Sequence, residues 1–559
     1  MPALHTASLG FDVDPTDGGI KTLLDDISLD LEEGSFTCIV GPSGCGKSTL
    51  LKLLGGLNRP TRGEVYLAGY EVGHLKRDLP LTVGYLPQFA SFHEELTVLE
   101  VLNNALALRL PKSVSVDQRT QWLAQVIELT GIESVTGQSP ATLSGGQLRR
   151  LALAEQLIGD PPFLFLDELT SGLDPHSERE IMWWLSDLVK KTGKTILLVT
   201  HAVTNLEVCD QVLFLSGGRL IFSGPPEDIL PYFQAPDLEH IYAQSESYAS
   251  YQSEIGAAGD GGGAGEPQAL QTARPPGGLS QFMTLIRRQT TLFWRDRGQL
   301  ILHGLLLFTF PLLVAVFAYR GLPEVRELSM HHQSNIVKGL AEQLMYLKDS
   351  FELAALVSGV SMFQVILLAL IGANNGAREI AKERDILFKE LSAGLSPVSY
   401  LTSKFLFVGV LSALQSLWMT VFVRSVCHFP GEWMPQFILL FLTTFAMSAT
   451  CLWFSAISKT PERASLLAIY SVGLQLPLSG AVLALPELMT WMTRPFIASY
   501  WGWSGYLRTF ENFRHFDVVS ASTKTEIATY GLSVTVLALH VTVAFFLTWR
   551  SLSQRVNEN

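Results

Sequence analysis

Short apolar runs alternate with longer amphipathic stretches through the first part of the chain, up to about residue 233. The runs 36–40, 83–86, 163–166, 195–199 and 211–215 have the length and residue types of buried strands, whereas 47–57 and 181–190 have helical spacing. This alternation predicts a sheet wrapped by helices, that is, an α/β domain over residues 1–233.

The alternation ends at about residue 234. Residues 256–278 are rich in Gly, Ala and Pro and include three consecutive glycines at 261–263. Such a composition is typical of a flexible tether. We therefore expect a linker over residues 234–279.

A short amphipathic segment follows the linker at residues 280–297. Its apolar stripe consists of Phe282, Leu285, Ile286, Leu292 and Phe293, and its polar side carries Arg287, Arg288, Arg295 and Arg297. The pattern indicates a helix that lies on the cytoplasmic surface of a membrane. A soluble helix packed on the first domain is the alternative.

Six long apolar segments occupy the rest of the chain, and each has about the ~20 residues that cross a bilayer as a helix. They lie at roughly 299–319, 352–373, 400–426, 436–457, 464–485 and 529–549. Arg424 ends the third segment and Pro477 interrupts the fifth, although proline is tolerated in spanning helices. The sequence thus predicts an all-α, six-helix transmembrane domain over residues 280–559, lying in a lipid bilayer.

The distribution of positive charge sets the expected orientation. Lys and Arg gather around 287–297, 378–389, 459–463 and 550–555, whereas the short loop 427–435 has neither. By the positive-inside rule the charged segments are cytoplasmic. An even number of spans then places both termini, and the first domain with them, in the cytoplasm, with segments 320–351 and 486–528 outside.

Composition excludes several other classes of protein. The net charge of −12 and the lack of a basic block argue against a nucleic-acid partner. Five cysteines without metal-binding or CxxC spacing argue against a disulfide framework. Residues 1–14 lack the charged and apolar regions of a signal peptide, in agreement with a cytoplasmic first domain.

A phosphate-binding loop directly follows the first buried strand. It has the pattern GxxxxGK[ST] and is followed by a predicted helix; its residues are Gly41, Pro42, Ser43, Gly44, Cys45, Gly46, Lys47 and Ser48, and Thr49 comes next. Backbone N–H groups of such a loop surround phosphates, and the helix N-terminus adds a positive dipole end. Lys47 is then expected to reach the β- and γ-phosphates of ATP, and Ser48 to hold Mg²⁺.

Two adjacent carboxylates end a later buried strand, 163–167. Asp167 is placed to bind the Mg²⁺ shell, and Glu168 to polarise the attacking water. An apolar strand that ends in Asp-Glu is common by itself. Its position about 120 residues after the phosphate-binding loop makes it a second nucleotide motif.

The segment Leu143-Ser-Gly-Gly-Gln147 resembles the signature sequence of the ABC ATPases, and further motifs of that family appear in order. Gln88 matches the Q-loop glutamine, Asp174 matches the D-loop aspartate and His201 matches the switch histidine. The resemblance covers residues 1–233. It implies that Glu168, His201 and Gln88 are catalytic, that Ser48, Gln88 and Asp167 hold Mg²⁺, and that the remaining matched residues bind ATP: 41–49, Ser144, Gly145, Gly146, Gln147 and Asp174.

The resemblance also implies a dimer. In this family the signature of one chain faces the γ-phosphate bound to the other chain, so one loop and one signature cannot complete a site alone. The expected partner is a second copy of this chain or a similar half-transporter. Two departures from the pattern are Leu169, which stands where proline is usual, and the unclear adenine-stacking residue, for which Val13 and Phe11 are candidates.

The order of the domains, ATPase first, resembles the White-type or G subfamily of half-transporters and their bacterial relatives. Local similarities occur at 94–102, 281–296 and 382–394, and the last of these resembles the cytoplasmic elbow that touches the ATPase domain. Charged residues snorkelling at a membrane edge are the alternative explanation for that stretch. Segment 486–528 resembles the region that dips back into the membrane over the exit, and interfacial anchoring explains its tryptophans equally well.

The sequence leaves the cargo unidentified. Polar residues inside spans are often functional, so Gln364, Gln415, Gln475 and His540 are candidates for the transport path, with interhelical hydrogen bonding as the alternative. We expect an exporter of lipid-like or hydrophobic cargo in a prokaryotic inner membrane. The alternatives are an importer or a glycan exporter, and, from another class, a regulatory ABC ATPase, which the six apolar segments disfavour.

Overall fold

The computed structural model describes residues 3–13, 19–74, 79–111, 114–171, 174–201, 205–244, 275–318, 336–482 and 484–558. The chain divides into two compact units. The first consists of residues 1–284, 385–396 and 556–559, and the second of residues 285–384 and 397–555. Most of the predicted linker, and most of the predicted outer segment 320–351, lies outside the residues whose side chains are described.

The first unit contains two sheets. The larger has the strand order β10-β9-β3-β8-β7-β6, and all of its neighbouring pairs are parallel except β9 with β10. Its strands are β3 (Phe36–Val40), β6 (Val83–Leu86), β7 (Phe163–Asp167), β8 (Thr195–Val199), β9 (Gln211–Ser216) and β10 (Arg219–Gly224). The residues of β3, β7 and β8 are all buried, as expected for parallel strands covered on both faces. The predicted α/β fold is confirmed.

The smaller sheet is antiparallel, with the order β2-β1-β4-β5. Its strands are β1 (Leu4–Val13), β2 (Lys21–Leu31), β4 (Arg62–Leu67) and β5 (Tyr70–Glu71). Alternate residues of β1 and β2, such as Leu4, Leu29 and Leu31, are buried in one apolar core with the helix that follows β3. The small sheet therefore packs against α1 (Lys47–Leu54), the helix that begins at the end of the phosphate-binding loop.

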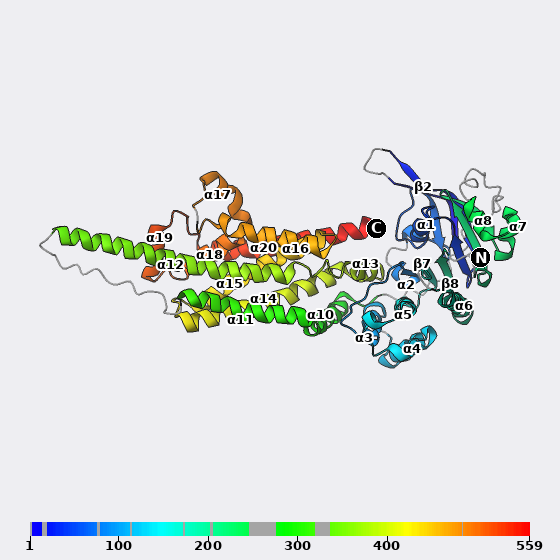
Figure 1. The fold of residues 1–559 in the computed structure, drawn as a ribbon, viewed down its shortest axis with the longest axis horizontal. Helices are drawn as coiled ribbons and strands as arrows, with labels where there is room; N and C mark the ends of the chain where they lie inside the picture. Colours follow the sequence, from blue (N-terminus) through cyan, green and yellow to red (C-terminus); the bar gives the residue numbers. More distant parts are fainter. Residues whose placement is uncertain are drawn as a thin grey trace. The chain divides into compact units, whose positions relative to one another are not determined.

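The helices of the first unit are α1 (Lys47–Leu54), α2 (Leu79–Thr82), α3 (Val98–Arg109), α4 (Val116–Thr130), α5 (Gly145–Leu157), α6 (Pro175–Thr192), α7 (Ile229–Phe233), α8 (Leu238–Ala243) and α13 (Arg384–Ser392). Helices α3, α4 and α5 pack on one another as a separate helical group (Figure 1). Thr97, Ser115 and Ser144 cap α3, α4 and α5, each in a reciprocal capping box. Helix α8 lies within the predicted linker, where Ile241 is fully buried, so ordered structure extends past residue 233.

The second unit is helical. Its elements are most of α10 (Gly278–Arg295), α11 (Arg297–Ala318), α12 (Ile336–Gly376), α14 (Pro397–Cys427), α15 (Trp433–Ile457), α16 (Pro461–Gln475), η6 (Pro477–Ser479), α17 (Glu487–Thr493), η7 (Arg494–Phe496), α18 (Ala498–Arg508), α19 (Arg514–Ser522) and α20 (Tyr530–Glu558). The long helices run alongside one another (Figure 1). Among the described residues, five helices are long and apolar enough to cross a membrane: 297–318, 351–376, 397–427, 433–457 and 530–554. The chain is therefore a multi-pass membrane protein.

The predicted fifth span, 464–485, is the one that the structure does not form as a single long helix. Helix α16 has 15 residues and stops before Pro477, which instead begins the short turn η6. A helix of that length rises about 22 Å, less than the ~30 Å hydrocarbon core. The cause is local, because proline lacks the N–H that would continue the helical hydrogen bonds.

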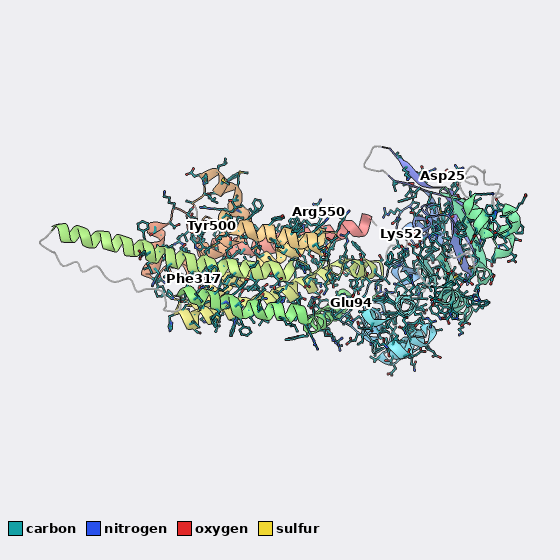
Figure 2. The ribbon with its side chains drawn as sticks, in the orientation of Figure 1. Asp25, Lys52, Glu94, Phe317, Tyr500 and Arg550 are labelled. Atoms are coloured by element: carbon teal, nitrogen blue, oxygen red, sulfur yellow. The ribbon has the colours of Figure 1, made fainter. Side chains whose placement is uncertain are left out.

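Helix α18 is buried along most of its length. Ten of its residues, Ala498–Leu507, are buried, and it packs against α12, α15 and α16. A Cβ at Gly502 would lie 2.3 Å from the Thr443 hydroxyl of α15, so glycine permits this close approach. Tyr500 of α18 and Phe317 of α11 lie toward one end of the second unit, and Arg550 toward the other (Figure 2). Segment 486–528 therefore returns into the helix bundle at the end opposite the basic C-terminal region.

Candidate active site

Four adjacent strands of the large sheet carry the predicted nucleotide-site residues at their carboxyl ends. The phosphate-binding loop follows β3, His201 follows β8, Asp167 and Glu168 end β7, and Gln88 follows β6. In open α/β sheets, ligands bind at this edge. Residues separated by up to 160 positions in sequence are thus brought together by the strand order alone.

The backbone of the phosphate-binding loop requires glycine at its two ends. Gly41 has φ +148°, and a Cβ there would lie 2.1 Å from the carbonyl oxygen of Leu215; Gly46 has φ +104°, and a Cβ would lie 2.7 Å from Leu24 Cδ2. The Lys47 side chain, which is 5% exposed, turns back over the loop and donates to the carbonyl oxygens of Gly41 at 2.8 Å and Pro42 at 2.9 Å. Burial lowers the pKa of Lys47.

Asp167 contacts the phosphate-binding loop directly. The Ser48 hydroxyl donates to Oδ1 of Asp167 at 2.8 Å, and the Tyr85 hydroxyl lies 3.3 Å from Oδ2. Burial raises the pKa of Asp167, whereas the hydrogen bond from Ser48 acts in the opposite direction. A hydroxyl and a carboxylate at this separation are hard oxygen donors and fit Mg²⁺, which is usually bound through one or two carboxylates together with substrate phosphates and water. Within the described residues no three acidic, His or Cys side chains form an all-protein metal site.

The three predicted catalytic side chains meet at Glu168. The side-chain amide of Gln88 donates to one carboxylate oxygen of Glu168, and Nε2 of His201 lies 2.9 Å from the other. Glu168 itself has φ +50°, an uncommon value for a non-glycine residue. Its N–H donates to the Val199 carbonyl and its own carbonyl accepts from Arg149, which fixes this backbone. Strain of this kind is often retained at functional positions.

The signature lies apart from this cluster. Ser144 is the N-cap of α5: its hydroxyl accepts from the N–H of Gln147, and the Gln147 side chain accepts from the N–H of Ser144. Ser144 and Gly145 are exposed. Within the described ranges, no hydrogen bond joins residues 144–147 to residues 41–49. Asp174 is likewise a helix cap, at the start of α6.

Sequence reasoning missed several residues that support the site. The N–H of Gly41 donates to the Tyr242 hydroxyl at 3.1 Å, and the Tyr242 ring packs edge-on against Phe214 of β9. Tyr242 lies in the short helix α8, where only its apolar neighbours could have indicated burial. Arg149 follows the signature by two residues and donates to the carbonyl oxygens of Glu168 and Ser171. Of the candidate adenine-stacking residues, Phe11 packs against the core of the first unit.

Most of the predicted elbow, 382–394, belongs to the first unit, which includes residues 385–396. The Lys389 ammonium of α13 lies 2.6 Å from Glu155 Oε2 on α5 and 3.1 Å from the Ser91 carbonyl, and it stacks over the Phe92 ring at 4.3 Å. Ser91 and Phe92 follow Gln88 by three and four residues. Both Lys389 and Glu155 side chains are almost fully buried. One lysine thus bridges the signature helix and the Q-loop segment.

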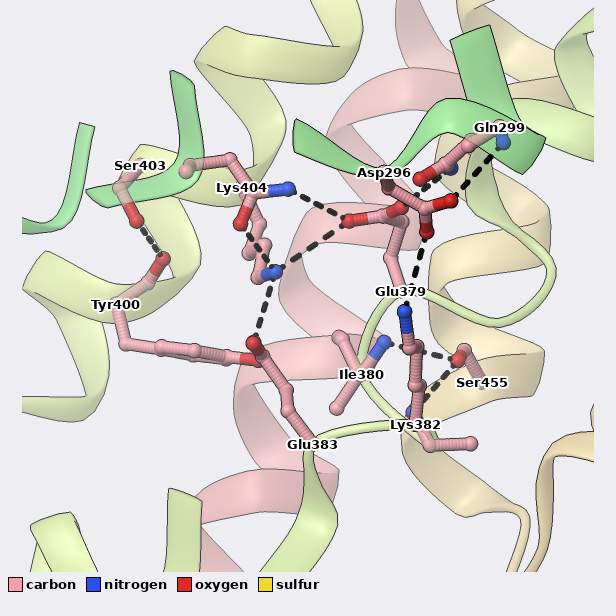
Figure 3. Close-up of polar contacts among 12 residues, drawn as sticks. Asp296, Gln299, Glu379, Ile380, Lys382, Glu383, Tyr400, Ser403, Lys404 and Ser455 are labelled. Atoms are coloured by element: carbon pink, nitrogen blue, oxygen red, sulfur yellow. Dashed lines mark hydrogen bonds and ion pairs between the residues drawn. The ribbon is translucent and has the colours of Figure 1, made fainter. Parts of the chain in front are cut away.

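A second buried charge cluster lies in the other unit, where the end of α12 meets α10, α11 and α14 (Figure 3). The Lys404 ammonium of α14 is paired with Glu383 at 2.7 Å and Glu379 at 3.3 Å, and it also donates to Gln289 at 2.7 Å. The Tyr400 hydroxyl donates to Glu383. Nearby, Lys382 pairs with Asp296 at 3.3 Å.

The candidate transport-path residues are mostly engaged between helices. Gln415 accepts from the Asn375 amide at 2.7 Å, Gln475 accepts from the Ser499 N–H at 3.0 Å, and His540 Nε2 lies 2.5 Å from the Pro495 carbonyl. Gln364 is fully buried in α12. These contacts favour the interhelical alternative for Gln415, Gln475 and His540.

Two family models match the chain. The one described as ABC transporter matches residues 24–171, and the one described as ABC-2 type transporter matches residues 280–501. An ABC transporter ATP-binding/permease protein of Mycobacterium tuberculosis is 31% identical over 511 residues, which are 88% of this chain and 56% of that protein. A taurine import ATP-binding protein of Pseudomonas aeruginosa is 36% identical over 238 residues, which are 42% of this chain and 85% of that protein.

Among solved structures, a dimeric ATP-binding cassette in a post-hydrolysis state with ADP and Pi has a TM-score of 0.37 and 28% identity, and covers 40% of this chain and 98% of that one. The chain spans 56% to 63% of the length of the first curated relatives that it matches.

Proposed function

This chain belongs to the ABC transporters and combines an ABC ATPase domain with an ABC-2 type membrane domain, and we propose that it is an ATP-hydrolysing half-transporter. The proposed direction is export, and the proposed cargo is lipid-like or hydrophobic. The main support for ATP hydrolysis as the driving reaction, here called the motor assignment, is the contact of both Gln88 and His201 with Glu168. This contact lies at the sheet edge next to the phosphate-binding loop.

In the proposed reaction the loop N–H groups and Lys47 bind the β- and γ-phosphates of ATP. Ser48, Asp167 and Gln88 are the proposed Mg²⁺ ligands, and the ion, when bound, neutralises charge on the phosphates. Glu168 orients the attacking water and accepts its proton. His201, which already lies at 2.9 Å from Glu168, contacts the γ-phosphate and keeps the carboxylate in position. Positioning and charge stabilisation account for most of the rate enhancement in phosphoryl transfer.

We also propose that the working unit is a dimer of two such chains. The exposed, reciprocally capped N-terminus of α5 supports this, because it presents a positive dipole end that Lys47 and its loop in the same chain do not reach. ATP held between the loop of one chain and the signature of the other then joins the two ATPase domains, and hydrolysis releases them.

The contact of Lys389 supports coupling between ATP and cargo. Movement of α5 or of the segment after Gln88 is transmitted to α13, which continues the chain from α12 and leads into α14. We place the protein in a prokaryotic inner membrane, with both termini in the cytoplasm and export as the direction of transport. The proposed chain crosses the membrane six times, and α16 and η6 together form the fifth crossing. The exposed apolar faces of α11, α14 and α20 fit a lipid bilayer. An importer or a glycan exporter is the second candidate.

Replacing Glu168 with Gln tests the motor assignment. The amide keeps the size of the side chain but cannot accept the proton of water, so ATP hydrolysis should fall by about 100-fold or more, and flux of a fluorescent phospholipid in proteoliposomes should fall with it. Glu128→Gln, at an exposed position of α4, is the matched control and should retain both activities. Flux that continues in the Glu168→Gln variant without ATP hydrolysis would show that this residue does not drive transport.

A further inference from the structure

A cleft of about 830 Å³ opens in segment 478–526 of the second unit. Its walls come from the end of η6, from α17 and η7, from the beginning of α18 and from residues 524–526. The volume lies within the range of small-molecule sites, ~300–1,000 Å³. None of the proposed nucleotide-site residues or transport-path candidates lines it.

Four charged side chains line the cleft, two of each sign: Glu487, Arg494, Lys524 and Glu526. Arg494 pairs with Glu526 at 3.1 Å and lies over the Tyr500 ring at 4.8 Å, so its position is held by the protein. Lys524 and Glu487, in contrast, have no ion-pair partner among the described residues. The cleft thus offers one cation and one anion that are free to meet a ligand.

The rest of the wall is mainly apolar, although Ser479, Thr490 and Thr525 also line it. Its apolar members include Leu478, Leu485, Phe496 and Trp501, whose indole N–H donates to the Arg494 carbonyl. Trp491 and Phe496 are 79% and 77% exposed, and Ile469 and Tyr470 of α16 are also largely exposed. Trp491 and Phe496 line the cleft and form its exposed apolar rim. Exposed aromatic side chains of this kind in a membrane domain are typical of a surface in contact with lipid.

We propose that this cleft binds the head group and upper acyl chain of a zwitterionic phospholipid. Lys524 pairs with the phosphate, and Glu487 pairs with the amine, which also lies against the Trp491 ring. The glycerol and the upper chain pack on the apolar wall, and the rest of the chain continues along the exposed rim into the bilayer. An anionic lipid lacks the group that Glu487 requires, and a purely apolar ligand leaves both charges unmatched.

Native mass spectrometry of the full-length protein in detergent, without nucleotide, tests the proposal. The probes are palmitoyl-oleoyl phosphatidylethanolamine and the matching phosphatidylglycerol. Wild type should retain the zwitterionic lipid in preference to the anionic one. Lys524→Met combined with Glu487→Gln, and separately Ala484→Trp, which fills the cleft, should each weaken its retention by about tenfold. Glu432→Gln, an exposed charge at the start of α15, is the control and should have no effect.

Three results would overturn the proposal: equal retention of the zwitterionic lipid in all variants, preference of wild type for the anionic lipid, or a change of oligomeric state without a change in lipid retention. The last would assign the cleft to a contact with a second copy. The proposal rests only on the membrane-spanning part of the proposed function. Because binding is measured without ATP, a failure of the motor assignment leaves this test unaffected. Thermal unfolding of each variant verifies that it is folded.

Discussion

Lys389 provides a direct test of how the ATPase domain is joined to the membrane-domain sequence. Lys389→Met keeps the length of the side chain but removes the ammonium that pairs with Glu155 at 2.6 Å, bonds the Ser91 carbonyl and covers the Phe92 ring. The Glu155 carboxylate retains Arg109, whose Nη2 lies 3.9 Å from Oε1. The substitution therefore leaves a buried carboxylate with a single, more distant cation.

The expected loss of stability follows from these contacts. A hydrogen bond to a charged group contributes about 1.5–3 kcal/mol, and removing one member of a buried ion pair costs about 3–5 kcal/mol. We expect a loss of about 3–5 kcal/mol, which corresponds to a fall in Tm on the order of 10 °C. In Lys389→Met combined with Glu155→Gln the buried carboxylate is gone, so the double variant should be more stable than the sum of the two single changes predicts.

The assay combines thermal unfolding with hydrogen exchange. In wild type, ATP should alter exchange in α13 and in the helices on either side of it. In Lys389→Met that response should be lost, while ATP binding to the nucleotide site persists, because no proposed ATP ligand contacts Lys389. Lys190→Met, at an exposed position of α6, is the control. An unchanged Tm together with an unchanged exchange response would refute the coupling role of Lys389.

Three further substitutions have defined outcomes. Lys404→Met removes the cation that Glu379 and Glu383 share and should lower the free energy of unfolding by about 3–5 kcal/mol. Adding Glu383→Gln should restore part of this loss, and both changes are measured by thermal unfolding. Asp167→Asn should raise the Tm of the nucleotide-free protein at neutral pH. The raised pKa of Asp167 means that the folded state binds the proton more tightly than the unfolded chain, so ionisation of this carboxyl destabilises the fold as pH rises. The increase in Tm should vanish at acidic pH, where both states are protonated, and MgATP should no longer stabilise the variant. Tyr242→Phe removes the hydroxyl that accepts from the buried Gly41 N–H. Loss of such a hydrogen-bond partner costs about 1–3 kcal/mol, so the KM for ATP should rise about fivefold, with kcat nearly unchanged. An unchanged KM would contradict a role of Tyr242 in positioning the phosphate-binding loop.

Much of the nucleotide site could be predicted because its geometry follows from short-range patterns. A glycine-rich loop between a strand and a helix has few possible conformations, and the carboxyl ends of parallel strands meet at one edge of the sheet. The resemblance to the ABC ATPases implied a common site for Gln88, Asp167, Glu168 and His201, and this sheet edge brings them together. Tyr242 was not, because nothing in a six-residue helix next to a Gly-rich segment indicates that its hydroxyl reaches the first glycine of the loop.

The membrane half was harder to predict from sequence. Hydropathy located five of the helices within a few residues, since the need to satisfy every backbone group in lipid leaves few alternatives. It could not show that Pro477 would end the fifth segment early or that α18 would be buried among α12, α15 and α16. The burial of α18 depends on side-chain packing such as that of Gly502 against Thr443. The pairing of Lys404 with Glu379 and Glu383 was missed for the same reason.

The central claim, that each ATP site is completed by the signature of the partner chain, is tested most directly by mixing two inactive variants. Lys47→Ala disables the phosphate-binding loop, and Ser144→Arg disables the signature. A mixed dimer pairs the intact loop of one chain with the intact signature of the other. Random 1:1 pairing should therefore restore about a quarter of the wild-type sites, and ATP hydrolysis should reappear in proportion. If each site were built within one chain, the mixture would remain as inactive as either variant alone.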